Sequence, residues 1–273
     1  MLPNQNDAPQ PDLRIVLTET LHPHEDHDFQ RSQPLIERLA SETVVINPPI
    51  VAPMGASQLL VLDGANRFHA LSHLGYPHIL VQVAPYESGY VELKTWRHLV
   101  CDWQPEALME HIKQLGDIQI LTGQHNSAIA HIIFRDNSII ALMSPVENTH
   151  ERNSALRQVV SIYQQNATLQ RTALAEPSEI WQLHPTAIAI VEFPHYRPAD
   201  IIAAARYNAY LPPGISRHII QGRALKVNYP LDKLRDESIS LAEKNEQLQR
   251  WVQEKLAERQ VRYYAESSYL FDE

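Results

Sequence analysis

The sequence has one cysteine and eight glycines among 273 residues, and each scarcity excludes a class of protein chemistry. Cys101 alone can form neither a disulfide framework nor a zinc ribbon, and a chain with a single thiol suits a reducing compartment. The glycines are scattered singly, whereas a P-loop and a dinucleotide-binding fingerprint each need glycines within about six residues of one another. A nucleotide would therefore have to be held by another kind of phosphate site.

Long apolar runs and an excess of basic residues are also absent. No segment approaches the roughly 20 apolar residues of a membrane-spanning helix. Residues 1–12 lack the basic and apolar regions of a signal peptide, and we expect them to be a disordered lead-in. Lys and Arg number 23 against 32 Asp and Glu, and this net charge of −9 argues against nucleic acid as a partner. These features predict a cytoplasmic protein without a membrane association, and a homodimer is compatible with them.

Apolar strand-like runs alternate with amphipathic helical segments along the whole chain, which predicts an α/β or α+β fold. The clearest unit is a strand at 59–62, a helix at 65–74 and a strand at 79–83, with Gly75 in the position that commonly ends a helix. Further elements are expected as a hairpin at 128–134 and 138–143, a helix at 153–170 and a strand at 223–227.

The chain is long enough for two lobes, and Gly116 is a candidate boundary between them. We expect residues 13–115 to form one lobe and residues 116–273 to form a second α/β lobe. The second lobe would include a long amphipathic helix near 236–259, in which the apolar side chains fall on one stripe.

The segment Asp63-Gly64-Ala65-Asn66-Arg67 joins an expected strand to the start of an expected helix. Free backbone N–H groups and the positive end of the helix dipole favour an anion at such a point. Gly64 would allow a phosphate to approach the backbone, and Arg67 could bind it through its guanidinium. The same pattern also fits an ordinary helix cap at Asp63 with a surface arginine.

The segment His22-Pro23-His24-Glu25-Asp26-His27-Asp28 holds six ionisable groups in seven residues. Imidazoles and carboxylates could bind a metal ion, although the spacing is not that of a structural zinc motif. Glu25 could instead serve as a general base, or the whole segment could be a solvated polar loop.

Three other clusters contain groups that could bind a ligand. His69 and His73 lie one helical turn apart without the glutamate of a zinc-protease motif, so surface histidines are the simpler interpretation. The other two segments fit a site for a small polar ligand or a structural turn equally well; they are Lys94-Thr95-Trp96-Arg97-His98 and Pro213-Gly214-Ile215-Ser216-Arg217-His218 followed by Gln221-Gly222-Arg223.

Taken together, these motifs resemble the ParB/sulfiredoxin superfamily, and within it the free L-serine kinases. The similar family members are the archaeal ADP-dependent enzyme and the ATP-dependent enzyme of staphyloferrin siderophore biosynthesis. The resemblance extends over roughly residues 13–235. It rests on the motifs Leu21-His22-Pro23-His24-Glu25, Pro48-Pro49-Ile50-Val51, Asp63-Gly64-Ala65-Asn66-Arg67, Thr95-Trp96-Arg97-His98, Leu211 to His218 and Gly222-Arg223-Ala224-Leu225.

The resemblance implies a kinase that transfers a phosphoryl group from ATP or ADP, with Mg²⁺, to the hydroxyl of L-serine. By this resemblance Glu25 and Asp63 are catalytic, while Asp63, Gly64, Asn66 and Arg67 hold the nucleotide and Trp96, Arg217 and His218 lie around the amino acid. The active site is expected in a cleft between the two lobes. Asn66 departs from the family, which generally has His there, and an amide can donate a hydrogen bond to phosphate but carries no charge.

Two other functions are compatible with parts of this pattern. A ParB-like nucleotide-binding regulator would keep the phosphate site without small-molecule chemistry. A sulfiredoxin-like reductase would need a reactive cysteine beside the phosphate motif, and Cys101 lies 38 positions after Asp63 in the sequence.

Overall fold

A computed structural model describes residues 9–27 and 29–264, which divide into two compact units. Unit 1 comprises the described parts of 1–22, 27–92 and 218–273, and unit 2 comprises 23–26 and 93–217. The chain therefore passes from one unit to the other four times. The last two of these passages fall within strands β7 (Val91–Thr95) and β14 (Ser216–Ile220), which pair with each other in a two-stranded sheet.

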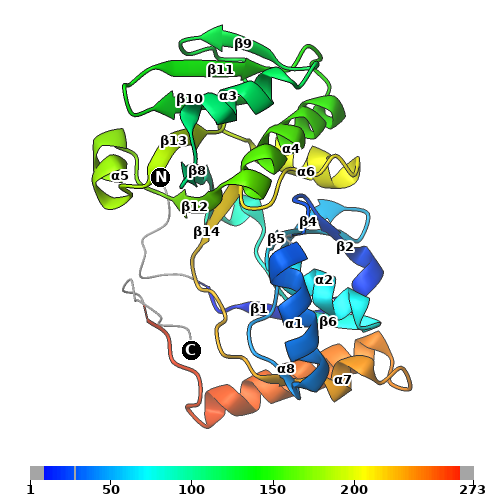
Figure 1. Ribbon diagram of the computed structural model, residues 1–273. Coiled ribbons are helices and arrows are strands. Elements are labelled where there is room, and N and C mark those ends of the chain that lie inside the picture. Colours follow the sequence, from blue (N-terminus) through cyan, green and yellow to red (C-terminus); the bar gives the residue numbers. More distant parts are fainter. Residues whose placement is uncertain (1–8, 28, 265–273) are drawn as a thin grey trace. The chain divides into compact units, whose positions relative to one another are not determined.

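Unit 1 is built on a five-stranded mixed sheet of order β1-β6-β4-β5-β2 (Figure 1). Strand β6 is buried along its whole length, runs antiparallel to β1 and parallel to β4, and so is an interior strand of this sheet. The strands are β1 (Asp12–Leu17), β2 (Leu21–Pro23), β4 (Ile50–Gly55), β5 (Gln58–Asp63) and β6 (His78–Val83).

The other elements of unit 1 complete its hydrophobic core. Helix α8 carries Leu248 into the same cluster as Ile15 and Leu71, so an element from the end of the chain packs on elements from its beginning. The side chain of Asn245 accepts a hydrogen bond from the Ile15 N–H at 2.9 Å and donates one to the Ile15 carbonyl at 2.8 Å, which satisfies backbone groups on edge strand β1. The elements are η2 (Thr18–Thr20), α1 (Phe29–Ser41), β3 (Val44–Val45), α2 (Ala65–His73), η3 (Tyr86–Ser88), β15 (Tyr229–Pro230), α7 (Asp232–Arg235) and α8 (Leu241–Ala257).

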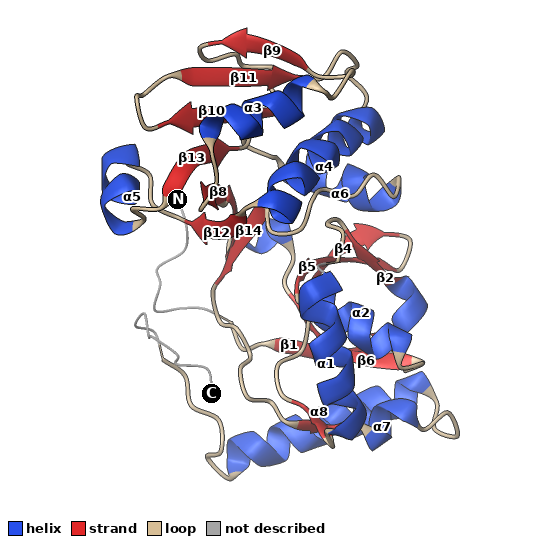
Figure 2. Ribbon diagram, viewed as in Figure 1, coloured by secondary structure: helices blue, strands red, loops and turns tan. Residues whose placement is uncertain are grey.

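Unit 2 is built on a six-stranded antiparallel sheet of order β12-β8-β13-β10-β11-β9 (Figure 2). Leu99 and Cys101 of β8 pack with Ile180 of α5, while His98 faces Tyr163 of α4, so successive side chains meet helices on opposite faces. The elements are β8 (Arg97–Cys101), α3 (Pro105–Lys113), β9 (Gln119–Thr122), β10 (Ala130–Phe134), β11 (Ile139–Met143), α4 (Thr149–Asn166), β12 (Thr168–Thr172), α5 (Pro177–Leu183), β13 (Ala187–Glu192) and α6 (Pro198–Arg206).

The mixed α/β class predicted from the sequence is confirmed, but the predicted lobe boundary differs from the structure. Residues 93–115 belong to unit 2 because β8 lies inside its six-stranded sheet. Residues 218–273 were assigned to the second lobe, yet the described ones belong to unit 1 because α8 packs on β1. The prediction of disorder for residues 1–12 falls mostly outside the described residues, and β1 begins at Asp12. Within the described ranges, no helix combines the length and apolar character that a membrane crossing needs.

Candidate functional site

The turn between β5 and α2 is shaped by Gly64, whose φ of 87° lies in the left-handed region. A side chain at this position would place its Cβ 2.8 Å from Arg67 Nη2 and 3.1 Å from the Cα of Pro49. Only glycine therefore allows Arg67 to fold back over the start of its own helix. The sequence prediction of a strand, a tight turn and a helix here is confirmed.

Asp63 lies between two arginines at this turn. Its Oδ2 is 3.4 Å from Arg67 Nη2 and also accepts a hydrogen bond from Arg223 Nη2. Burial alone would raise the pKa of Asp63, but the charges of Arg223 and Arg67, with hydrogen bonds from Arg223 and the Gly64 amide, lower it overall. Asp63 is therefore ionised at neutral pH and holds both guanidinium groups at the N-terminus of α2.

Arg67 has hydrogen-bonding capacity left at this turn. Its Nε is buried and has no hydrogen-bond partner among the described residues. Burial lowers the pKa of Arg67, Asp63 opposes that shift, and the positive charges of Arg223 and Arg38 add to it. The guanidinium groups of Arg67 and Arg223 thus repel each other around the carboxylate of Asp63, at the N-terminus of α2. An anion bound here would relieve the repulsion and satisfy the buried N–H.

Glu25 is held by a different part of the chain, within unit 2. Its Oε1 accepts hydrogen bonds from the Ile215 N–H at 3.1 Å, the Ser216 N–H at 2.6 Å and the Ser216 hydroxyl at 2.6 Å. Its Oε2 accepts one from the Gly214 N–H at 2.7 Å. Oε2 thus accepts one hydrogen bond where Oε1 accepts three, so Oε2 is the oxygen with room for a further donor.

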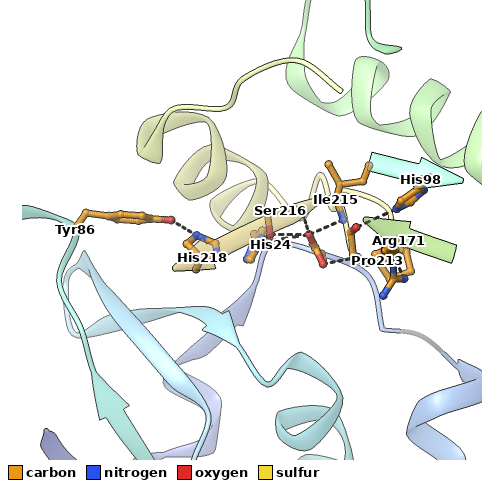
Figure 3. Close-up of polar contacts among 10 residues, drawn as sticks. His24, Tyr86, His98, Arg171, Pro213, Ile215, Ser216 and His218 are labelled. Carbon is orange, nitrogen blue, oxygen red and sulfur yellow. Dashed lines mark hydrogen bonds and ion pairs between the residues drawn. The ribbon is translucent and has the colours of Figure 1, made fainter. Parts of the chain in front are cut away.

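The same loop is fixed on its other side by residues of unit 2, which Figure 3 shows together. His98 Nε2 lies 3.0 Å from the Gly214 carbonyl, and Arg171 Nη2 donates to the Pro213 carbonyl at 3.0 Å. Burial lowers the pKa of His98 to about 4, so this fully buried ring is neutral and donates through Nε2 while Nδ1 faces Tyr163 Oη. Hydrogen bonds from His98 and Arg171 therefore hold the loop that contacts Glu25.

The sequence pattern did not identify His24 and Ser216 as partners of Glu25. His24 is 3% exposed, and its Nε2 lies 2.6 Å from Ser216 Oγ, which itself donates to Glu25 (Figure 3). The sequence features that could have indicated this contact are the neighbouring His24 and Glu25 in one segment and Gly214-Ile215-Ser216 in another. Nothing in either segment alone indicates that they meet.

The three residues expected around the amino acid do not share one unit. The Arg217 guanidinium lies 4.6 Å from the centre of the Trp96 ring, a cation–π contact within unit 2. His218 belongs to unit 1, where its Nε2 lies 2.7 Å from Tyr86 Oη. Trp96 and Arg217 are therefore placed together in the same unit as Glu25, and a role for His218 in binding the amino acid stays a prediction.

Two alternative interpretations of the sequence find no support among the described residues. No group of three or more His, Cys, Asp or Glu side chains in residues 9–27 and 29–264 could hold a metal ion, and His27 instead stacks on His69 with ring centres 3.9 Å apart. Asp28, the last residue of the histidine-rich segment, lies outside the described residues. Cys101 is fully buried, and burial raises the pKa of its thiol, which does not suit the reactive cysteine of a reductase.

Comparisons with known proteins agree with the motif resemblance. No protein-family model matches the sequence. A protein of Staphylothermus marinus named ATP-dependent L-serine kinase is 25% identical over 235 residues, covering 81% of this chain and 90% of the relative. The ATP-dependent L-serine kinase SbnI of Staphylococcus aureus is 22% identical over 278 residues, covering 96% of this chain and 97% of the relative.

Solved structures show the same fold. A C-terminally truncated SbnI from Staphylococcus aureus superposes with a TM-score of 0.71 at 19% identity, covering 90% of this chain and 97% of that one. A free serine kinase in complex with AMP gives a TM-score of 0.70 at 16% identity, covering 83% and 95%. The named sequence relatives confirm the resemblance to free L-serine kinases drawn from the motifs, and the solved structures confirm the fold.

Proposed function

We propose that this protein is a free L-serine kinase that converts L-serine to O-phospho-L-serine with ATP as the phosphoryl donor. The single observation that carries the proposal is the turn at Asp63, Gly64 and Arg67, where Arg67 and Arg223 converge at a helix N-terminus and a buried Nε lacks a partner. ATP is preferred to ADP as the donor because the two relatives that align with most of this chain are both named ATP-dependent.

The phosphates of the nucleotide would bind at the N-terminus of α2. Arg67 supplies a buried N–H, Gly64 lets the phosphate approach the backbone, and Arg223 supplies a second guanidinium. Asp63 orients both arginines, so they are preorganised before a phosphate arrives. The magnesium ion would arrive as part of the substrate MgATP. A magnesium ion bound to nucleotide phosphates usually keeps several water ligands and takes few ligands from the protein.

Glu25 would act as the general base through its less occupied oxygen, Oε2. In the reaction the serine hydroxyl gives its proton to Glu25 while its oxygen forms a bond to the γ-phosphorus. The bond from that phosphorus to the β–γ bridging oxygen breaks, and ADP leaves. The four hydrogen bonds to Glu25 fix the direction of its carboxylate for this step.

The amino acid would be recognised by groups next to Glu25 in the chain's second unit. Arg217 directly follows Ser216, whose amide and hydroxyl both contact Glu25. Its guanidinium, supported by the ring of Trp96, suits the carboxylate of serine. The predicted cleft between the two lobes stays a prediction.

The proposal is tested by incubating the purified chain with MgATP or MgADP and L-serine. We expect O-phospho-L-serine, detected by phosphorus NMR and mass spectrometry, in an amount that matches the nucleotide consumed. L-Threonine and D-serine serve as matched acceptors for specificity. Tight nucleotide binding without any phosphoserine would contradict the kinase and favour a ParB-like regulator that keeps only the phosphate site.

A further inference from the structure

Arg223 contacts Asp63 from a segment that has no regular structure of its own. Residues 221–228 form neither helix nor strand, and Lys226 and Asn228 adopt left-handed φ values of 52°. The side chains of Arg223 and Asp63 are each 37% exposed, and ion pairs with this much solvent contact contribute little stability by themselves. Another feature must hold the segment in place.

Gln82 of strand β6 contacts this segment on both sides of Arg223. Its Nε2 donates to the Gly222 carbonyl at 2.9 Å, and its Oε1 accepts from the Ala224 N–H at 2.8 Å. The residue is 3% exposed, so both ends of its amide need these partners. The two hydrogen bonds fix the backbone immediately before and after Arg223.

The backbone of Gln82 is joined to the other wall of the same turn. Its N–H donates to the Pro49 carbonyl at 2.9 Å, and the Cα of Pro49 is the backbone atom that closes the space beside Gly64. One buried residue on the interior strand β6 thus sets the position of Pro49 through its backbone and of Arg223 through its side chain.

We propose that Gln82 is a positioning residue of the phosphate site, because it holds Arg223 at Asp63 in the geometry that receives a nucleotide phosphate. The inference rests on the proposed function only for the identity of the ligand. Without the amide, residues 222–224 lose two anchors and Arg223 samples positions away from Asp63. Affinity for a phosphate-bearing ligand then falls, while the rest of unit 1 keeps its core.

The first test compares Gln82→Leu with Asn245→Leu in the full-length chain. Asn245 is a matched control because its carboxamide also makes two hydrogen bonds to backbone groups in unit 1. Both are with Ile15, which lies far from Arg223 in the sequence. We expect Gln82→Leu to weaken ADP binding by about tenfold, as loss of a charge-assisted contact does, with adenosine binding unchanged. Asn245→Leu lowers the melting temperature and leaves the ratio of ADP to adenosine affinity as in the wild type. Equal effects of the two variants on that ratio would overturn the proposal.

The second test is a double-mutant cycle with Arg223→Ala. If Gln82 acts through Arg223, the double variant binds ADP no more weakly than Arg223→Ala alone. Additive losses would show that Gln82 acts by another route and would overturn the assignment.

Amide hydrogen exchange gives a readout that does not depend on catalysis. We expect Gln82→Leu to raise exchange in residues 221–228 relative to the wild type, and Asn245→Leu to leave that segment unchanged. Unchanged exchange in Gln82→Leu would contradict the anchoring. If the wild type binds ADP but produces no phosphoserine, the kinase proposal fails while these tests of Gln82 keep their meaning.

Discussion

Glu25 combines two tasks in one carboxylate, and each would respond differently to substitution. Three of its four hydrogen bonds come from backbone amides of residues 214–216, so the side chain also anchors the loop that precedes Arg217. A glutamine can accept through one oxygen only, and its amide would face an N–H donor on the other side. Loss of activity in Glu25→Gln therefore has to be separated from loosening of the loop.

We expect Glu25→Gln to lower phosphoserine formation by about 10²–10⁴-fold, the usual effect of removing a general base. ADP affinity, measured by calorimetry, stays near the wild-type value because the phosphate groups are assigned to Arg67 and Arg223. Ser216→Ala is the control, since it removes one hydrogen bond to Glu25 and keeps the carboxylate. Retention of more than about half the wild-type turnover in Glu25→Gln would exclude Glu25 as the base.

Arg67 should contribute to binding in proportion to the phosphate charge of the ligand. We expect Arg67→Ala to weaken ADP and ATP binding by about 1.5–3 kcal/mol, with a smaller effect on adenosine. Arg38→Ala is the matched control, because Arg38 is already paired with Glu42 at 3.1 Å and its side chain is 62% exposed. Calorimetry that finds both nucleotides bound as tightly as by the wild type would place the phosphate site elsewhere.

At the scale of elements, the sequence predicted the helices and strands that depend on nearby residues. It missed the segments whose conformation depends on residues far away in the sequence. The β5–α2–β6 unit was predicted because its apolar runs, the Asp63-Gly64 turn and Gly75 all act within a few residues of one another. A strand was predicted at 223–227, and this is wrong: the Ala224 and Lys226 N–H groups donate to the side chains of Gln82 and Asn47, and among the described residues of this stretch only the Val227 N–H donates to a backbone carbonyl, that of Ile46. No local pattern could indicate such partners.

The predicted helix at 153–170 shows a smaller error of the same kind. Helix α4 runs from Thr149 to Asn166, and its N-cap Asn148 accepts a hydrogen bond from the Glu151 N–H at 2.9 Å. This capping pattern is visible in the sequence and marks the true start. Its end could not be placed as easily, because Thr168–Thr172 pairs with β8, an element that precedes it by some 70 positions. The same reasoning explains the site: Asp63, Gly64 and Arg67 were predictable as one turn, whereas Arg223 and the loop partners of Glu25 were not.

The turn before α2 can be tested with two glycines of similar conformation. Gly64 and Gly75 have φ values of 87° and 73°, but a Cβ on Gly75 would meet nothing within 4 Å. Gly75→Ala therefore reports the cost of the left-handed conformation alone, on the order of 1–2 kcal/mol. We expect Gly64→Ala to cost more in urea unfolding and to weaken ADP binding, because its Cβ displaces Arg67. Equal unfolding free energies and normal ADP binding in both variants would contradict the close approach at Gly64.

At the scale of the whole molecule, unit 1 is assembled from separate stretches of the chain. Its phosphate turn comes from residues 63–67, while Arg223 and helix α8 come from the last part of the sequence. A fragment that ends at residue 116, the lobe boundary expected from the sequence, would lack both. The hydrophobic core would also lose the side chains of Tyr229 and Leu248.

A fragment that follows the observed division should behave differently. The Gln221 N–H donates to the Tyr90 carbonyl at 3.0 Å, and the Trp96 N–H donates to the Ile215 carbonyl at 2.9 Å. These bonds show that β7 and β14 run antiparallel, like the two strands of a hairpin. Residues 93–217 can therefore be replaced by a short Asn-Gly connection. We expect this version of unit 1 to bind ADP within about tenfold of the full chain, since a retained site keeps most of its charge-assisted contacts. It should form no phosphoserine, because the loop that holds Glu25 is missing, and the fragment 1–116 should bind no ADP at all. Binding by 1–116 as tight as by the full chain would remove Arg223 from the phosphate site and restore the boundary expected from the sequence.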